Sequence, residues 1–515
     1  MNGAESLLRT LVHGGVEVCF MNPGTSEMQF VAAVDRVAGM RCVLGLQEGV
    51  VSGAADGYAR MTNKPAATLL HLGPGLANAL ANFHNARRAR VPIVNIIGEH
   101  ATYHRQYDPP LHSDIAGLAA TVSGWVTTVE DSAQVPALTH AAIRAANGPP
   151  GQIATLIIPA DCTWAESALP VTLPVIPPVP VAIDQQAIDI AAKTLMSGEP
   201  AALIVQGRAL LEEGLMLASR IRGKTGARIL CDCFVPRLQR GAGRAALEII
   251  PYFVESALQL LQELKHVILV GAKPPVGFFA YPGLPNRLLP PGCQVQTLSQ
   301  PGEDAITVLQ QLLEATGAGI TDSDRQPLQR PPLPSGDLTP LTIAQSIAAL
   351  MPEHAIIADE TITSGLGLLA ATTHAPPHDW LFNCGGSLGQ GLPVATGAAV
   401  ACPERKVLSL EADGSGMYTL QALWTQARES LAVTTVIYAN RQYRILNIEH
   451  QRIGAGPPGS KARDMMSLER PDMDWVKLAQ GLGVPAKRVN TAEEFNQTLK
   501  SFLGEPGPNL IEAII

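Results

Sequence analysis

The sequence lacks long apolar runs, is poor in cysteine and has no run of like charges. No uncharged apolar stretch reaches the roughly 18 residues of a membrane-spanning helix, and residues 5–12 are amphipathic rather than signal-like. Eight cysteines among 515 residues are too few for a disulfide framework. We therefore expect a reduced, cytoplasmic protein of enzyme size, with no secretory signal and no membrane association.

The charge balance and the turn residues exclude further classes. The chain has 37 Lys and Arg residues against 45 Asp and Glu residues, a net charge of −8 at pH 7, which gives no electrostatic reason to expect nucleic acid as a partner. Its 47 glycines and 41 prolines together stay below the roughly 25–30% that marks low-complexity chains. The length is typical of about three globular domains.

Two proline-rich stretches, residues 169–180 and 321–336, divide the chain into blocks of 1–168, 185–316 and 337–515. Because proline cannot donate ladder hydrogen bonds, these stretches predict linkers rather than central strands. Each block alternates short β-branched runs with helical patterns, which is typical of parallel βαβ units. We therefore predict an α/β fold with three open parallel-sheet domains.

The strands matter because parallel sheets bind ligands beyond their carboxyl ends, so the residues that follow each strand are the candidate site residues. The predicted strands are 16–20, 41–46, 67–71, 92–97 and 153–158 in the first block, 202–205, 228–231 and 266–271 in the second, and 355–359, 406–410, 434–439 and 509–514 in the third.

Asp413-Gly414-Ser415 and Asn440 form the sharpest pattern of the third block. Each follows a predicted strand, and a predicted helix over 417–428 joins the two strands into one βαβ unit. The strand ends are therefore adjacent, so the Asp413 carboxylate and the Asn440 amide can converge. Such hard oxygen ligands suit Mg²⁺, and the N–H groups of a helix start attract phosphate. The tripeptide alone is also typical of an ordinary turn.

Glu48 is the corresponding candidate in the first block. It follows an apolar strand and begins a run with small residues at 49, 53, 54 and 57, which predicts close helix packing. A carboxylate among apolar and small residues either binds a specific partner or carries a raised pKa. A glutamate in the first turn of a helix is also common because it interacts favourably with the helix dipole.

Together these motifs resemble the thiamine-diphosphate-dependent enzymes. The resemblance rests on Asp413-Gly-Ser with Asn440 after 26 intervening residues, on Glu48 within Leu46-Gln-Glu-Gly, and on the runs 22–25, 55–60, 70–75 and 384–393. The order of the motifs is that of the decarboxylase and acetolactate synthase branch. It implies a pyrimidine-binding domain, a middle domain and a diphosphate-binding domain, and it covers essentially the whole chain.

The resemblance also implies roles for single residues. Glu48 would hydrogen-bond the aminopyrimidine ring of the cofactor, and Leu388 would be the apolar wedge that bends the cofactor. The metal ligands would be Asp413, Asn440 and the backbone oxygen of Gln442, holding Mg²⁺ against the diphosphate. The remaining implied cofactor contacts are Thr363, Gly386, Gly414, Ser415 and, on the substrate side, Tyr443.

The implied substrate side carries further candidates with open alternatives. His71 would relay protons, although a histidine at a strand end is often only structural. Thr25, or its neighbour Ser26, would touch the substrate carboxylate or cap a helix. His112, with His104, would face the pocket from a loop. The segment 453–461 is either a mobile cover or a surface loop.

The implied reaction is decarboxylation of a 2-oxo acid, carboligation, or both. Two departures bear on it. Pro110-Leu111 stands where acetolactate synthases have a glutamine, which favours a pocket like that of benzoylformate decarboxylase. That enzyme's second active-site histidine would fall near Phe278-Phe279, where this chain has none. Ala412 and Ala439 replace the usual glycine and asparagine at positions that do not bind metal.

Two alternatives remain open. One is acetolactate synthesis from two 2-oxo acids, a transferase rather than a lyase reaction. The other is a relative that binds the cofactor without turnover, although the presence of Glu48 favours activity. The resemblance further implies at least a homodimer, more readily a homotetramer, with active sites between subunits. FAD in the middle domain is not expected.

Overall fold

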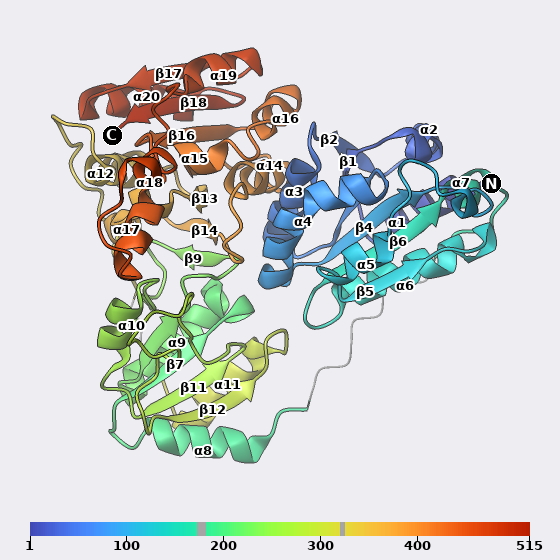
Figure 1. The fold of residues 1–515 in the computed structure, drawn as a ribbon. Helices are drawn as coiled ribbons and strands as arrows, with labels where there is room; N and C mark the ends of the chain where they lie inside the picture. Colours follow the sequence, from blue (N-terminus) through green and yellow to red (C-terminus); the bar gives the residue numbers. More distant parts are fainter. Residues whose placement is uncertain (173–181, 320–324) are drawn as a thin grey trace.

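The computed structural model describes residues 1–172, 182–319 and 325–515 (Figure 1). Of the two predicted linkers, residues 173–180 and 321–324 lie outside the described residues. The chain forms three sheets, each flanked by helices, which confirms the predicted α/β class. All eight cysteines are free thiols. Within the described residues, no helix is long and apolar enough to cross a membrane.

The first sheet has six parallel strands in the order β2-β1-β3-β4-β6-β5. Its strands are β1 (Val18–Asn22), β2 (Arg41–Leu44), β3 (Ala66–Leu70), β4 (Ile93–Glu99), β5 (Trp125–Thr128) and β6 (Ile153–Pro159). The helices are α1 (Gly3–His13), α2 (Met28–Val34), α3 (Glu48–Thr62), α4 (Leu72–Ala89), α5 (Ile115–Ala120), α6 (Val135–Asn147) and α7 (Ala160–Trp164). The central strands β3, β4 and β6 are buried along their whole length because helices cover both faces.

The middle sheet has five parallel strands in the order β10-β8-β7-β11-β12. They are β7 (Ala201–Val205), β8 (Arg228–Cys231), β10 (Glu248–Ile249), β11 (His266–Val270) and β12 (Gln294–Ser299). The flanking helices are α8 (Gln185–Leu195), α9 (Glu212–Thr225), α10 (Val254–Leu261) and α11 (Ala305–Thr316).

The third sheet has seven strands in the order β17-β18-β16-β15-β13-β14-β9. They are β13 (Ile356–Glu360), β14 (His378–Phe382), β15 (Val407–Ala412), β16 (Val433–Ala439), β17 (Ala486–Val489), β18 (Asn509–Ile514) and β9 (Leu238–Arg240). Strand β9 comes from the middle block and pairs antiparallel with β14, which the sequence did not predict. The single predicted helix over 417–428 is interrupted, with α15 (Asp413–Gly416) before it and α16 (Ala422–Arg428) as its second half.

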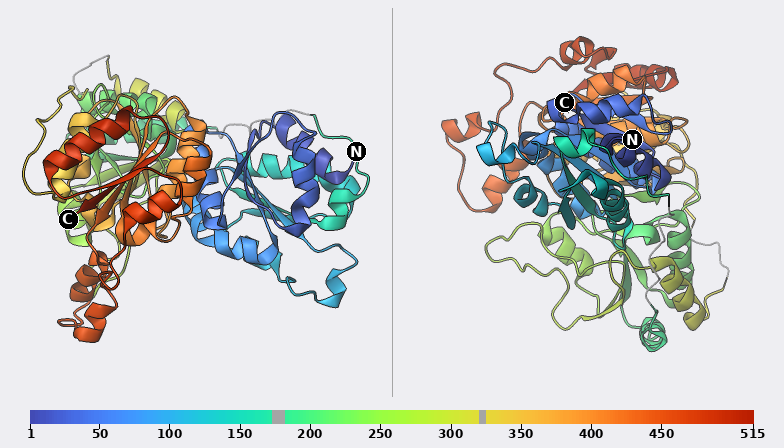
Figure 2. Two further views of the ribbon diagram at one scale, coloured as in Figure 1. Left: turned by 90° about the horizontal axis from the view of Figure 1, so that it is seen from above. Right: turned by 90° about the vertical axis from the view of Figure 1, so that its right-hand side faces the viewer.

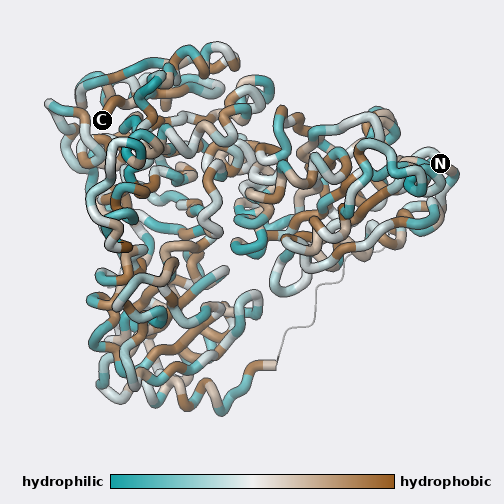
Figure 3. The backbone as a smooth tube through the Cα atoms, in the orientation of Figure 1, coloured by the Kyte–Doolittle hydropathy of each residue, from teal (hydrophilic) through white to brown (hydrophobic). Residues whose placement is uncertain are grey.

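Further helices cover the third sheet. They are α12 (Pro340–Leu350), α13 (Leu368–Ala371), α14 (Gly391–Ala401), α17 (Arg444–Arg452), α18 (Ser460–Asp464), α19 (Trp475–Gly481) and α20 (Ala492–Gly504). Figure 2 shows α17 and α18 projecting from the body of the molecule. The segment 453–461, predicted as a cover or a surface loop, comprises the connection between these two helices and the first two residues of α18. Figure 3 shows the apolar residues concentrated in the strands of each sheet.

The first and third sheets are joined by helix α3 packing on α14, at very close range. A Cβ at Gly57 would lie 2.1 Å from the carbonyl oxygen of Val394, and one at Gly53 would lie 2.5 Å from the Pro393 side chain. The small residues predicted for close helix packing therefore serve this contact. Nearby, Arg60 is fully buried in an ion pair with Asp56.

Candidate active site

Glu48 is the first residue of α3 and follows the carboxyl end of β2 after three intervening residues. The side chain of Gln47 caps the helix by accepting a hydrogen bond from the Val50 N–H. The Glu48 carboxylate accepts a hydrogen bond of 3.0 Å from the Asn78 side chain on α4. This carboxylate therefore has a specific partner in the first domain.

One amide connects the start of α3 to the third domain. Asn82 Nδ2 donates to the Gly49 carbonyl at 2.8 Å and to the Gly389 carbonyl at 3.1 Å. Asn85 exchanges two further hydrogen bonds with the backbone of Ser387. Because Gly49 follows Glu48 directly, these bonds hold Glu48 beside the loop 383–391, which contains Leu388. In this structure all of these contacts lie within one chain.

His71 is held by a buried glutamate that the sequence analysis missed. Its Nδ1 lies 2.9 Å from Oε2 of Glu27, which also accepts the Gly24 N–H at 2.7 Å. Glu27 is 2% exposed, and burial raises its pKa despite the neighbouring His71. A Cβ at Gly98 would lie 1.7 Å from the other carboxylate oxygen. The signal that was available is the position of Glu27, just after the turn that follows the first strand.

Thr25 and His112 lie at the same edge of the first sheet. The short helix Thr25–Glu27 is capped by Gly24 and Glu27, not by a hydroxyl. The capping alternative for Thr25 therefore does not apply, and its side chain is exposed. His112 is also exposed on its loop. On the same loop, His104 lies with its ring 5.7 Å from that of His100.

The loop 383–391 is shaped by another buried carboxylate, Glu360, at the end of β13. It accepts hydrogen bonds from the N–H groups of Gly389 and Gly391 and from the Asn383 side chain. Burial raises the pKa of Glu360 to about 7. Gly386, with φ +77°, needs the freedom of glycine. Within this loop Leu388 is half-buried.

Asp413 stands beyond β15 and is 1% exposed. Its two oxygens accept the N–H groups of Gly414 at 2.9 Å and of Arg441 at 2.6 Å. Burial raises the pKa of Asp413 to about 6. The Arg441 contact holds the carboxylate beside the segment that carries Asn440 and Gln442.

Hydrogen bonds at both the oxygen and the nitrogen of its amide orient the Asn440 side chain. Its oxygen accepts the Gln442 N–H at 3.0 Å, and its Nδ2 donates to the Ser364 hydroxyl at 3.3 Å. The second bond brings Asn440 to the short helix Ile362–Gly365, which contains Thr363. Thr363 is 8% exposed.

Gly414 and Ser415 differ in what they offer a phosphate group. A Cβ at Gly414 would lie 2.5 Å from the Tyr443 ring, so only glycine fits beneath that ring. The Ser415 hydroxyl is 3.2 Å from the Glu360 carbonyl and 3.3 Å from the carboxylate of Glu411. That hydroxyl already has partners within the protein, so the implied phosphate contact would rest on backbone N–H groups. Burial and the nearby Glu360 raise the pKa of Glu411.

Backbone strain accompanies three of the candidate residues. Leu72, Ile362 and Arg441 have positive φ values of 51°, 53° and 57°. They directly follow or precede His71, Thr363 and Asn440. Positive φ is rare outside glycine and exceptional for a β-branched residue, and such strain is concentrated at functional sites.

The residues present fit a magnesium ion with a diphosphate. Among the described residues, the buried carboxylate of Asp413 is bonded by backbone N–H groups, and burial raises its pKa to about 6. The Asn440 amide oxygen completes a hard donor set, which suits Mg²⁺ because this ion takes few protein ligands. Within the described ranges, no group of three or more His, Cys, Asp or Glu side chains could hold a metal.

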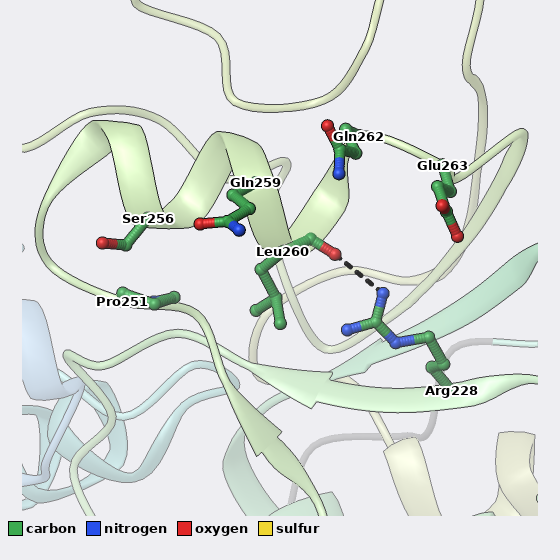
Figure 4. Close-up of a pocket in the computed structure, with 7 residues that line it drawn as sticks. All are labelled: Arg228, Pro251, Ser256, Gln259, Leu260, Gln262 and Glu263. Atoms are coloured by element: carbon green, nitrogen blue, oxygen red, sulfur yellow. Dashed lines mark hydrogen bonds between the residues drawn. The ribbon is translucent and has the colours of Figure 1, made fainter.

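A pocket on the middle domain is a weaker candidate for a functional site. It has a volume of about 440 Å³ and lies on the middle domain. Figure 4 shows its one cation, Arg228, turned toward the Leu260 carbonyl, to which it donates at 2.7 Å. Glu248 binds the same guanidinium, so the one cation of this pocket is already paired.

Comparison with known proteins agrees with the site. Residues 1–120 match the N-terminal TPP binding domain of thiamine pyrophosphate enzymes, and residues 366–513 match the C-terminal TPP binding domain of the same enzymes. The chain therefore belongs to the thiamine pyrophosphate enzymes, which confirms the family that the motifs resembled.

Two curated relatives span nearly the whole chain. The "Putative acetolactate synthase large subunit IlvX" of Mycobacterium tuberculosis is 53% identical over 100% of this chain and 99% of its own length. Benzoylformate decarboxylase of Pseudomonas aeruginosa is 28% identical over 97% of this chain and 96% of its own. Among solved structures, a 4-hydroxybenzoylformate decarboxylase of Rhodococcus jostii RHA1 has a TM-score of 0.84 at 23% identity, covering 99% of this chain and 98% of that one.

Proposed function

We propose that the protein is a thiamine-diphosphate- and Mg²⁺-dependent enzyme that decarboxylates a 2-oxo acid, ligates the resulting acyl unit, or does both. The domains would be a pyrimidine-binding domain over 1–168, a middle domain over 185–316 and a diphosphate-binding domain over 337–515. The observation that carries the proposal is the buried Asp413 carboxylate, which the Arg441 N–H holds beside the segment of Asn440 and Gln442 at one edge of the third sheet. A cytoplasmic location follows from the composition.

Each residue has a role in this proposal. Asp413, Asn440 and the Gln442 carbonyl would hold Mg²⁺, with Thr363, Gly386, Gly414, Ser415 and Tyr443 around the cofactor. When bound, thiamine diphosphate supplies the nucleophilic carbon and the electron sink for loss of CO₂. Glu48 would hold a proton against the aminopyrimidine, and Leu388 would keep the cofactor bent.

The substrate would meet residues of the first domain. The exposed hydroxyl of Thr25 would bind the substrate carboxylate, and His112 would lie at the pocket entrance. His71 would move a proton at Nε2, because Nδ1 is engaged by Glu27. A carboxylate behind an imidazole fixes the ring orientation and the tautomer, as a proton-transfer residue requires.

The choice between decarboxylation and acetolactate synthesis depends on two observations. Leu111 in place of glutamine favours a pocket like that of benzoylformate decarboxylase, whereas the name of the 53% identical relative favours acetolactate synthesis. The experiment is CO₂ release from a panel of 2-oxo acids, with thiamine diphosphate and Mg²⁺ added or withheld. Aldehyde from branched or aromatic acids supports decarboxylation, and acetolactate from pyruvate supports the alternative. No cofactor-dependent turnover of any acid would leave only a non-catalytic binding protein.

A homodimer or homotetramer with active sites at subunit interfaces is part of the proposal, as the family resemblance implies. Mixing refolded Glu48→Gln and Asp413→Ala chains tests it. If the two faces come from different subunits, half of randomly formed dimers carry one intact site, which restores about a quarter of wild-type activity. No recovery would mean that one chain supplies both faces, as the contacts of Asn82 arrange them here, and would contradict the interface.

A further inference from the structure

Helix α4 carries three asparagines on one side, toward the start of α3 and the third domain (Figure 1). Asn78, Asn82 and Asn85 are spaced four and three residues apart, so they lie on the same face of the helix. Asn78 donates to the Glu48 carboxylate. Asn85 exchanges two hydrogen bonds with the backbone of Ser387. Asn82 lies between them and bonds to both segments, so a single amide joins the start of α3 to the loop 383–391.

The peptide group that follows Leu388 is fixed by three side chains. The N–H of Gly389 donates to the Glu360 carboxylate at 3.1 Å. The carbonyl of Gly389 accepts the Thr419 hydroxyl at 2.9 Å and Asn82 Nδ2 at 3.1 Å. Glu360 and Thr419 belong to the third domain itself, so Asn82 is the one of these three that refers the loop to the first domain.

Helix α3 leaves a space for the Asn82 amide. A Cβ at Gly53 would lie 3.2 Å from Asn82 Nδ2 and 2.5 Å from the Pro393 side chain, so a larger residue would press on the amide and on α14. The same Nδ2 donates to the Gly49 carbonyl at 2.8 Å. Because Gly49 directly follows Glu48, this bond fixes the backbone from which the Glu48 carboxylate extends.

The other end of the Asn82 amide is buried without compensation. Asn82 is 1% exposed, and within the part of the chain that the structure describes its Oδ1 atom has no hydrogen-bond partner. Burying an unpartnered polar atom is unfavourable. Turning the amide round would aim Oδ1 at the carbonyl oxygens of Gly49 and Gly389, so only the present orientation allows both bonds. The favourable contribution of this side chain is therefore the link between the two segments.

We infer that Asn82 is a positioning residue, which sets the places of Glu48 and of the Leu388 loop through its two N–H groups. The inference rests on the proposed function for the roles of Glu48 and Leu388, and it adds the residue that aligns them. Both bonds lie within one chain, so the inference holds whether the two segments serve one active site or the two sites of a dimer. Because rates depend steeply on alignment, a shift of either segment lowers turnover.

The test uses Asn82→Leu and Asn82→Asp, which keep the approximate size of the side chain. Leucine removes both donors at every pH. An ionised aspartate also removes them, whereas a protonated carboxyl group can donate one bond again. We expect kcat of both variants to fall at least about tenfold at pH 8. As the pH is lowered, the activity of Asn82→Asp relative to wild type should rise, and that of Asn82→Leu should stay low. A purely structural role would leave both ratios independent of pH.

Asn509→Asp is the matched control. Asn509 is also 1% exposed, donates through Nδ2 to the Phe502 carbonyl at 3.0 Å and has an unpartnered Oδ1. It is the first residue of β18, at the opposite end of the third sheet from Asp413. Its kcat per folded protein should stay within about twofold of wild type. If the Asn82 variants lose no more activity than Asn509→Asp, the inference is wrong.

A second measurement needs no turnover and separates this inference from the proposed function. Hydrogen exchange of backbone amides is followed in the cofactor-free protein. We expect residues 48–53 and 383–391 to exchange faster in Asn82→Leu than in wild type or Asn509→Asp. If wild type turns over no 2-oxo acid while this difference is found, the proposed function fails and the positioning contact stands. Equal exchange of both segments in all three proteins would overturn the inference.

Discussion

Replacing Glu27 by Gln tests whether the buried pair behind His71 serves proton transfer. The substitution is nearly isosteric, and its amide oxygen can still accept the Gly24 N–H that now binds the Glu27 carboxylate. It removes the negative charge 2.9 Å from His71 Nδ1. It also places an NH₂ group near Gly98, where the Glu27 Oε1 atom has no hydrogen-bond partner.

The magnitude follows from the type of contact that is lost. A hydrogen bond to a charged group contributes about 1.5–3 kcal/mol, and about 1.4 kcal/mol in a barrier changes a rate tenfold. If His71 carries a proton during turnover, the variant should therefore lose about ten- to a hundredfold in kcat/KM. Gly98→Ala should lower activity in the same direction, because its Cβ would displace the same carboxylate while leaving its charge.

The assay is kcat/KM for CO₂ release as a function of pH, with circular dichroism and melting temperature as controls for folding. A role in proton transfer changes the shape of the pH profile, whereas a purely structural role lowers only the amount of folded enzyme. Glu130→Gln, which alters an exposed partner of Arg105 on the same domain, should leave the profile unchanged. Turnover of the Glu27 variant within about twofold of wild type at every pH would refute the reasoning.

Three further predictions concern the other carboxylates. Glu48→Gln should slow turnover at least about tenfold in steady-state assays; activity equal to wild type would defeat the proposed mechanism. Asp413→Ala should abolish Mg²⁺-dependent retention of thiamine diphosphate during gel filtration, and retained cofactor would contradict the metal site. The pKa of Glu360 is raised from 4.5 to about 7 in the folded state, so between these pH values the folded state binds a proton that the unfolded state has lost. The free energy of unfolding therefore falls as pH rises from 4.5 to 7. At 1.36 kcal/mol per pKa unit, the loss is about 3 kcal/mol. Between pH 5 and pH 8 the melting temperature of the wild type should therefore fall more than that of Glu360→Gln. An equal fall in both proteins would contradict the raised pKa.

Much of the fold was predictable because buried parallel strands are apolar along their length. The predicted strands 153–158 and 434–439 are found as Ile153–Pro159 and Val433–Ala439. Strand β14 was missed because it begins with His378 and Asp379, which an apolar pattern excludes. Both are buried, and Asp379 is compensated by Arg237 and Arg405, which are too distant in sequence for local reasoning to find.

Edge strands were missed for a different reason. Strand β17 contains Lys487 and Arg488, both exposed, because one side of an edge strand faces solvent. Its sequence carries no apolar run that would predict a strand. Its pairing with β18 depends on the tertiary structure alone.

The residues of the candidate site also fall into those that the local sequence reveals and those that it does not. Glu48, Asp413 and Asn440 follow strands, and their motifs lie within short stretches of chain, so sequence reasoning could find them. Glu27 and Glu360 acquire meaning only through distant partners, His71 and the glycines of the loop 383–391. Glu360 was nonetheless accessible, since it directly follows a predicted strand, and the strand-end rule would have selected it.

Strand β9 limits how the middle block can be exchanged between related enzymes. Leu238–Arg240 completes the third sheet by pairing with β14, although the residues on both sides of it belong to the middle block. A chimaera joined at the two linkers would bring a foreign segment to this edge. Unless that segment reproduces the antiparallel register with His378–Trp380, the graft would leave β14 as an unprotected sheet edge, open to pairing with other chains.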